Sequence, residues 1–360
     1  MSYKFKICAP TGERWIGENC PCFIVAELSA NHGQDLNKAK EIIRQSAAAG
    51  ADAIKLQTYL PSTMTLDCDN EHFLVAGETG PDDWKNKTLY QLYQQAYTPW
   101  EWHPILQKLT EELGMIFFST PFDATAVDFL ESLNVPLYKI ASYELTDVLL
   151  LEKVAKTKKP VIISIGFGDL DEVTMALETL RRHGAKDIAI LHCVTNYSKE
   201  PDLKHTNLST IRDLEKRFGT VTGFSDNTGG IEIPLQAVMV GAAVIEKHII
   251  VREGDKSLDA KFSLEPNEFK LLVTKVREFE TAYGKPVYGP RNQNENYFKN
   301  FRRSIFASCD IKKGERLTAK NMRVVRPSHG LAPRYWDQVV NKKAVVDIKM
   351  GTPMTWEGFE

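Results

Sequence analysis

The chain has 360 residues, 43% hydrophobic and 26% charged, a composition typical of a folded globular protein rather than a disordered one. Its 45 Lys and Arg against 47 Asp and Glu give a net charge of −2, so no overall positive field exists to hold a nucleic acid. No apolar run approaches the roughly 20 residues that span a membrane, and the first residues lack the apolar core of a secretion signal; we therefore expect a cytoplasmic protein.

Eight short runs of apolar, often β-branched residues recur along the first 250 residues. Each is nearly continuously apolar, which is typical of strands buried on both faces of a parallel sheet. We predict strands over 23–28, 53–59, 115–120, 136–142, 160–166, 188–194, 221–226 and 243–250.

Amphipathic stretches lie between and after these runs. Asp35 and Asp123 each stand where a helix N-cap is needed, and Gly50 stands where the first of these helices should end. We predict helices over 36–49, 102–113, 124–133, 148–156, 170–183, 208–217, 231–241 and 266–282.

Eight strands, each followed by a helix, predict an α/β fold in which residues 1–283 form a (β/α)8 TIM barrel. The alternative is a doubly wound open sheet. No G-x-G-x-x-G segment follows the first strand, which counts against a dinucleotide-binding version of that sheet.

Three further regions stand apart. The connection 60–98, which includes glycines within 77–80, is unusually long and leaves the C-terminal end of a strand, where barrels hold their active sites. The polar, Gly- and Pro-containing stretch 284–300 is typical of a linker. Residues 301–360 contain short runs in which apolar and polar residues alternate, and glycines separate these runs. This pattern predicts a small, mostly β domain.

Polar side chains stand at the C-terminal end of every predicted strand, where a barrel that needed only packing would not bury charges. Lys55 and Lys139, with several hydroxyls, can hold a phosphorylated anion, and nearby carboxylates can transfer protons. His248 can bind a divalent metal. These residues alone leave open a Schiff-base aldolase with Lys139 as the amine. Taken singly, each of these residues could serve only the fold, as a salt bridge, a turn former or a hydrogen-bonded core residue. Their convergence at one end of the predicted barrel favours a ligand site.

Six segments are more distinctive than the rest. They read AELSANH (26–32), GADAIKLQT (50–58), STPF (119–122), YKIAS (138–142), EKH (246–248) and RPSHGLAP (326–333). The first five resemble the sialic acid synthase family, and the sixth resembles that family's C-terminal antifreeze-like (SAF) domain. The resemblance covers essentially the whole chain. Within the family, residues 27–32 and 55–59 look most like the branch of pseudaminic acid synthases.

The resemblance implies a condensation of phosphoenolpyruvate (PEP) with an N-acetylated amino sugar. Carbon-3 of PEP attacks the aldehyde of the open-chain sugar, water adds at carbon-2, and phosphate leaves, which gives a nine-carbon 2-keto acid. A divalent metal, Mn²⁺ or Mg²⁺, positions and polarises the aldehyde. Because the enol of PEP is already the nucleophile, this reaction replaces the Schiff-base alternative.

The resemblance also implies roles for matching residues. Lys55, Thr120, Lys139, Ser142, Ser164 and Ser225 would bind PEP. Glu144, Tyr197 and Asp259 would contact the sugar, joined by Arg326 from the partner chain of a domain-swapped homodimer. Glu27, Glu246 and His32 are the candidate catalytic or supporting groups, and His248 is the expected metal ligand, with Asn227 beside it.

The expected product is pseudaminate, made from 2,4-diacetamido-2,4,6-trideoxy-altrose. Sialic (N-acetylneuraminic) or legionaminic acid synthesis is the alternative, and a non-catalytic carbohydrate-binding relative is a remote one. The sugars differ in whether carbon-6 carries a hydroxyl, so the pocket wall near carbon-6 should discriminate among them. We expect residues 60–98 to form that wall.

Three positions depart from the family pattern. Asn227 stands where the family usually has a metal-binding histidine, Ile165 where it has threonine, and Ser198 where it has proline. An amide oxygen is a harder and weaker ligand than imidazole. We therefore expect looser metal binding that tolerates magnesium better.

Overall fold

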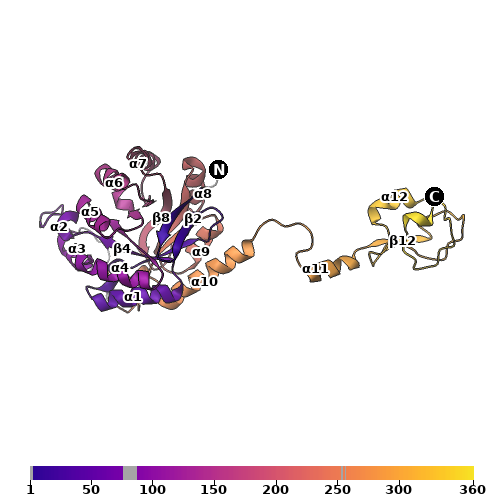
Figure 1. Cartoon of the computed structure of the whole chain (residues 1–360), viewed down its shortest axis with the longest axis horizontal. Coiled ribbons are helices and arrows are strands. Elements are labelled where there is room, and N and C mark those ends of the chain that lie inside the picture. The colour runs from indigo at the N-terminus through magenta and orange to yellow at the C-terminus, as the bar shows by residue number, and fades with distance from the viewer. Residues whose placement is uncertain (1–2, 76–86, 253, 256) are drawn as a thin grey trace. The chain divides into compact units, whose positions relative to one another are not determined.

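The computed structural model describes residues 3–75, 87–252, 254–255 and 257–360. The chain divides into two compact units, Met1–Tyr283 and Gly284–Glu360. Figure 1 colours them along the chain from indigo to yellow. We call them the barrel unit and the C-terminal unit and describe each by itself.

Eight parallel strands close into a barrel in the order β10-β3-β4-β5-β6-β7-β8-β9. They are β3 (Phe23–Glu27), β4 (Ala53–Thr58), β5 (Ile116–Pro121), β6 (Tyr138–Ile140), β7 (Val161–Ser164), β8 (Ile188–Ser198), β9 (Val221–Thr228) and β10 (Val244–His248). Because β10 pairs with both β9 and β3, the sheet has no open edge. The predicted TIM barrel is therefore confirmed, and the doubly wound sheet is excluded.

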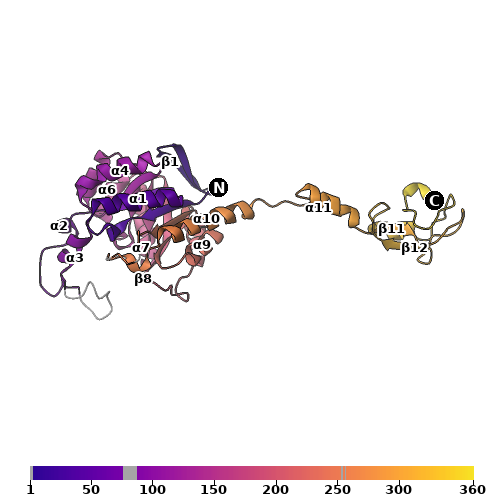
Figure 2. The same ribbon diagram turned by 90° about the horizontal axis from the view of Figure 1, so that it is seen from below.

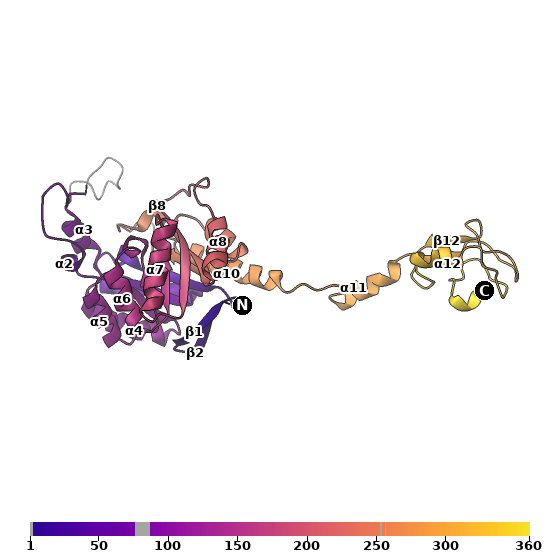
Figure 3. The same ribbon diagram turned by 90° about the horizontal axis from the view of Figure 1, so that it is seen from above.

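Eight helices cover the barrel (Figures 1 and 3). They are α1 (Leu36–Ala49), α4 (His103–Glu112), α5 (Ala124–Ser132), α6 (Val148–Lys156), α7 (Leu170–Arg182), α8 (Ser209–Phe218), α9 (Glu232–Met239) and α10 (Pro266–Tyr283). The carboxylates of Asp35 and Asp123 accept backbone N–H groups at the starts of α1 and α5, as predicted. None of the helices in the described residues is long and apolar enough to cross a membrane.

Alternation along each strand produces two apolar layers. Side chains such as Ile24, Ile54 and Ile245 face the helices, whereas Val25 and Val244 fill the inside of the barrel. The same alternation decides which polar side chains at the strand ends face inward.

An N-terminal hairpin, β1 (Lys4–Ala9) and β2 (Gly12–Gly17), was absent from our predicted elements. Its Phe5, Ile7 and Ile16 pack against the barrel-filling residues at the N-terminal ends of the strands. The alternation of charged and apolar residues in KFKICA is the signal for a half-buried strand. The hairpin closes the end of the barrel opposite the cavity described below.

The long connection 60–98 contains two helices, α2 (Pro61–Met64) and α3 (Leu89–Ala96), which lie side by side (Figures 1 and 2). A bridge between Leu74 and Thr88 draws the connection together. The predicted glycine-containing stretch 77–80 lies outside the described residues.

The C-terminal unit has its own apolar core, which includes Ile305, Leu317, Met322 and Ile348. Its two strands, β11 (Ser304–Ala307) and β12 (Met322–Val325), pair antiparallel, and isolated bridges extend the pairing. Short helices α11 (Gln293–Phe298) and α12 (Trp336–Val339) complete it. The stretch predicted as a linker therefore contains one helix, α11.

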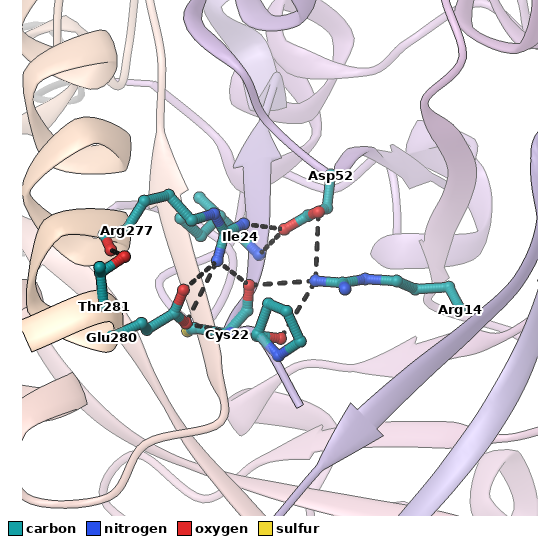
Figure 4. Close-up of polar contacts among 8 residues, drawn as sticks. Arg14, Cys22, Ile24, Asp52, Arg277, Glu280 and Thr281 are labelled. Carbon is teal, nitrogen blue, oxygen red and sulfur yellow. Dashed lines mark hydrogen bonds and ion pairs between the residues drawn. The ribbon is translucent and has the colours of Figure 1, made fainter. Parts of the chain in front are cut away.

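A polar network centred on Asp52 ties the first barrel strand to the last helix (Figure 4). Asp52 Oδ2 accepts the backbone N–H of Ile24 at 2.8 Å and lies 2.8 Å from Arg277 of α10. Its Oδ1 lies 3.2 Å from Arg14 of β2. Both arginines also donate to the backbone carbonyl of Cys22. One carboxylate thus connects the hairpin, β3 and α10 at the closed end of the barrel.

We predict that Asp52→Ala lowers the free energy of unfolding of the barrel unit by about 2 kcal/mol, because it leaves two partly buried guanidinium groups and one N–H without their acceptor. Urea unfolding followed by tryptophan fluorescence measures this loss. Asp213→Ala is the control, since Asp213 pairs with Arg217 on an exposed helix face and should cost under about 0.5 kcal/mol. Equal losses in both variants would contradict the assignment.

Candidate active site

A cavity of about 410 Å³ opens at the C-terminal ends of the strands. All eight barrel strands contribute side chains to its lining. These side chains sit at alternate positions, as with Lys55 and Gln57 on β4, because only every second residue of a strand faces the inside. A barrel's functional residues normally gather at this end.

Thirteen of the fifteen predicted site residues line this cavity. They are Glu27, Lys55, Thr120, Lys139, Ser142, Glu144, Ser164, Tyr197, Ser225, Asn227, Glu246, His248 and Asp259. Side chains from the ends of all eight strands therefore converge, and Asp259, more than 230 positions after Glu27, joins them from the loop that follows β10.

His32 and Arg326 are the two predicted residues outside the lining. The backbone N–H of Gln34 donates to His32 Nδ1 at 3.0 Å, and Nε2 lies 3.2 Å from Thr98 Oγ1. Burial lowers the pKa of His32 to about 4, so the imidazole is neutral and both its nitrogens are engaged. His32 therefore anchors residue 98 rather than reaching the cavity. Arg326 lies in the C-terminal unit and is exposed.

Four charged side chains form the floor of the cavity, and none is more than 5% exposed. Lys55 Nζ lies 2.6 Å from Glu27 Oε2 and 3.8 Å from Glu246 Oε1. Lys139 Nζ lies 3.4 Å from the same Glu246 oxygen. We call Glu27, Lys55, Lys139 and Glu246 the charged floor.

The charged floor has unequal proton affinities. Burial alone would raise the pKa of Glu246, but Lys139 and Lys55 outweigh it and lower that pKa. Burial likewise opposes the charge of Lys55, but Glu246 and Glu27 raise its pKa. Burial, reinforced by Glu246, raises the pKa of Glu27 to about 7 against the opposing effect of Lys55. Near neutral pH, Glu27 can therefore accept a proton. Burial lowers the pKa of Lys139, against the opposing effect of Glu246, so Lys55 is the firmer positive charge of the floor.

Hydroxyl groups surround this floor. Lys55 Nζ donates to Thr120 Oγ1 at 3.0 Å, and Ser225 Oγ donates to Glu246 Oε1 at 3.0 Å. Within the described part of the chain, Ser164 Oγ and Glu246 Oε2 are buried without a hydrogen-bond partner. The Ser164 hydroxyl can donate to a bound anion, whereas the Glu246 oxygen is an acceptor and requires a donor from a ligand or from water.

The opposite wall of the cavity is largely apolar. It is formed by Tyr59, Met64, Val75, Leu89, Leu92, Tyr93, Ala96, Phe122 and Leu258. Six of these residues come from the connection 60–98, as expected for part of the pocket wall. The cavity thus joins a charged floor to a wall suited to methyl groups.

Glu144 lies between these two regions. Its carboxylate is mostly buried, and its Oε2 is without a hydrogen-bond partner in the described residues. Burial raises the pKa of Glu144 to about 7, with Lys139 acting in the opposite direction. A ligand with hydroxyl or amide donors would stabilise its ionised form.

His248 presents the metal-ligand candidate. Its Nδ1 lies 3.2 Å from Ser29 Oγ, which leaves Nε2 for the cavity. Burial lowers its pKa to about 4, so the ring is neutral and able to ligate. Asn227 lies beside it and donates to Cys193 Sγ at 3.4 Å. In the described residues no group of three His, Cys, Asp or Glu side chains could hold a metal by itself.

Two contributions were not assigned from the sequence. Gln57 Nε2 donates to Glu27 Oε1 at 3.1 Å and so orients that carboxylate; its position two residues after Lys55 was the available signal. Asn31 donates to the carbonyl of Ile249 and to Ser263 Oγ, each at 2.8 Å. Asn31 thereby secures the loop that carries Asp259, a long-range contact that no local pattern reveals.

Comparison with known proteins finds relatives over nearly the whole chain. A model described as the NeuB family matches residues 42–288, and the SAF domain matches 302–360. The pseudaminic acid synthase of Helicobacter pylori is 41% identical over 342 residues, 94% of this chain and 98% of that protein. The N,N'-diacetyllegionaminic acid synthase of Legionella pneumophila is 34% identical, covering 96% of each chain. The N-acetylneuraminic acid synthetase structure from Leptospira borgpetersenii is 32% identical with a TM-score of 0.70, covering 83% of this chain and 97% of that one.

We predict that Gly166→Ala weakens PEP binding about tenfold, measured by titration calorimetry. Gly166 has φ +43°, and an added Cβ would lie 2.5 Å from Ser142 Cβ, so Ser142 must move. Gly241→Ala is the control, because Gly241 has φ +112° with open space around it. Equal effects of the two substitutions on affinity would show that backbone strain, and not displacement of Ser142, is responsible.

Proposed function

The chain belongs to the NeuB family, and we propose that it is a pseudaminic acid synthase, an enzyme that condenses PEP with 2,4-diacetamido-2,4,6-trideoxy-altrose and water to give pseudaminate and phosphate. The observation that carries this proposal is the single cavity in which a cationic, hydroxyl-lined floor faces an apolar wall. Relatives about 40% identical over nearly the whole chain are named pseudaminic acid synthases.

The floor supports the PEP half of the proposal. PEP carries a phosphate and a carboxylate, and we assign their binding to Lys55, Thr120, Lys139, Ser142, Ser164 and Ser225. Two lysines and four hydroxyls supply enough donors for both anionic groups. Bound PEP would further raise the proton affinity of Glu27, because it adds negative charge beside that carboxylate.

Glu27 is the group we assign to proton transfer. It titrates near neutral pH, and both its oxygens are held, one by Lys55 and one by Gln57. In the reaction the new carbon–carbon bond joins carbon-3 of PEP to the sugar aldehyde carbon. Water supplies the new oxygen at carbon-2, and the bond from carbon-2 to the bridging oxygen breaks as phosphate leaves. We assign Glu246 to holding Lys55 and Lys139 in place.

The upper cavity supports the sugar half. We assign Glu144, Tyr197 and Asp259 to the polar groups of the acceptor, which carries hydroxyl and amide donors. The apolar wall from residues 60–98 suits the carbon-6 methyl and the acetyl methyl groups of a trideoxy sugar better than the hydroxyls of N-acetylmannosamine. An apolar wall rejects an added hydroxyl by about 100-fold at most, so sialic acid synthesis remains an alternative. Legionaminic acid synthesis remains one as well, because its trideoxy-mannose acceptor also lacks the carbon-6 hydroxyl.

A divalent metal fits this site only in part. His248 Nε2 and the amide oxygen of Asn227 are available in the lining, and Mg²⁺ and Mn²⁺ accept such hard donors together with water and substrate oxygens. Among the residues that the structure describes, no three His, Cys, Asp or Glu side chains could form a closed metal site. When bound, the metal would polarise the sugar aldehyde. We therefore propose a weakly held Mn²⁺ or Mg²⁺ that substrate helps to retain.

We further propose that residues 1–283 carry the reaction and that 301–360 act as a SAF domain in a domain-swapped cytoplasmic homodimer. Arg326 of the partner subunit would then complete the sugar site. Tyr143 lines the cavity yet is exposed, and the exposed ring of Phe167 packs against it, so a covering domain would bury both.

The test is phosphate release from PEP with Mn²⁺ or Mg²⁺ and a panel of three sugars, with product masses measured by mass spectrometry. The panel is the diacetamido-trideoxy-altrose, the diacetamido-trideoxy-mannose and N-acetylmannosamine. Release with the altrose sugar and a product of pseudaminate mass is the expected result. Release with another sugar only would move the assignment to a sister synthase, and no release from a folded protein would favour the non-catalytic relative.

We predict that the KM for the sugar rises as pH falls below about 7, because protonation of Glu144 removes a carboxylate acceptor. Above this pKa the carboxylate accepts the sugar's donors, and below it that charge is lost. Steady-state kinetics at constant saturating PEP measure the profile. Glu144→Gln should have a higher KM that no longer rises at acid pH through this group; an unchanged profile shape in the variant would contradict the role.

We predict that Asn227→His lowers the half-saturating Mn²⁺ concentration about tenfold, because imidazole is a stronger ligand than an amide oxygen. Mn²⁺ titration of phosphate release, together with direct Mn²⁺ binding measured by electron paramagnetic resonance, follows the change. Ser198→Pro restores another family residue without adding a ligand and should leave Mn²⁺ binding unchanged. An unaltered half-saturation point in Asn227→His would refute the explanation for loose metal binding.

A further inference from the structure

Asp226 and Lys247 are the middle residues of the Ser-Asp-Asn and Glu-Lys-His segments, and the proposed reaction gives neither of them a task. They are neighbours in the parallel register of β9 and β10. Because side chains alternate along a strand, the residues flanking them line the cavity while Asp226 and Lys247 lie on the other face of the sheet. Those flanking residues are Ser225, Asn227, Glu246 and His248.

The two side chains form a fully buried ion pair. Lys247 Nζ lies 2.8 Å from Asp226 Oδ2, and both side chains have 0% exposure. Lys247 also donates to the backbone carbonyl of Thr228. Asp226 Oδ1 accepts the N–H of Thr228 at 3.0 Å and its hydroxyl at 2.7 Å. The end of β9 is thereby fastened to β10 by one lysine and one carboxylate.

Stability alone gives no reason for an ion pair here. Removing two charges from water costs about as much as their attraction returns, and apolar residues of similar volume often serve packing as well. An ion pair with directed hydrogen bonds is satisfied in only one arrangement of the two strands, whereas an apolar contact tolerates several. On the cavity side, Ser225 also donates to Glu246. The same two strands are therefore linked on both faces at one level.

We propose that Asp226 and Lys247 are positioning residues that set the separation of Ser225 and Asn227 from Glu246 and His248. Neither touches substrate; they act through the strand ends that carry the floor and the metal-ligand candidates. The inference rests on the proposed function where catalytic activity is the readout. It also implies that the ion pair stabilises the ends of β9 and β10 locally, whether or not the protein catalyses a reaction.

The test is the full-length Asp226→Asn/Lys247→Met double variant, which keeps an acceptor for Thr228 and approximates the length of the lysine. We expect a thermal midpoint within a few degrees of the parent, because the variant leaves no unpaired charge behind. We expect kcat to fall about 10- to 100-fold and the KM for PEP to rise, because small displacements of binding groups cost catalysis heavily. Asp52→Asn is the control, since it loosens the opposite end of the barrel and should leave kcat unchanged.

Amide hydrogen exchange, without substrates, separates this inference from the proposed function. We expect exchange at 225–228 and 246–249 to accelerate about tenfold or more, with β5 and β6 unchanged. Parent-like exchange at these strand ends, acceleration throughout the barrel, or a parent-like kcat and KM would overturn the inference. If the parent releases no phosphate, the proposed function fails and the exchange measurement alone decides. If the double variant does not fold, Lys247→Arg, which keeps both charges but changes the length and shape of the cation, undergoes the same measurements with the same criteria.

Discussion

The site depends on the mutual neutralisation of four charges inside a barrel. Each of Glu27, Lys55, Lys139 and Glu246 would be costly to bury alone, and together they offset one another over 2.6 to 3.8 Å. The consequence is a floor whose net charge depends on the protons at Glu27 and Lys139, because burial raises the pKa of the first and lowers the pKa of the second. Such a floor is preorganised for an anion because its ammonium groups are already desolvated and already held by carboxylates.

The fold meets this constraint through alternation along its strands. One face of each strand points into the barrel and supplies the floor, and the other face packs on the helices. Adjacent residues of a strand therefore have different tasks, one binding ligand and the next packing in the structure. Ser225 with Asp226, and Glu246 with Lys247, are pairs of this kind. The hairpin and the Asp52 network close the far end of the barrel, which leaves the C-terminal ends of the strands as the cavity's location. Most of the apolar wall then comes from the long connection 60–98.

Much of this architecture was predictable from the sequence, for physical reasons. Doubly buried strands are continuously apolar, helices begin at capping aspartates, and all strand ends of a barrel converge, so a shared polar site could be expected from the sequence. The thirteen individual residues that line it were named through the family resemblance. The hairpin β1–β2 was overlooked because its alternation spans only six residues a strand. His32 was expected near the chemistry, yet it is turned toward Thr98 by a hydrogen bond that depends on a distant segment. Asn31 and Gln57 act through partners that local patterns do not reveal.

The most direct test of the account is a crystal structure of the protein soaked with PEP. The account predicts the phosphate and carboxylate within hydrogen-bonding distance of Lys55 and Lys139, with Ser164 Oγ engaged by the ligand and the sugar wall left open. PEP bound outside the charged floor, for example at the second cavity lined by Lys199 and Lys261, would contradict it.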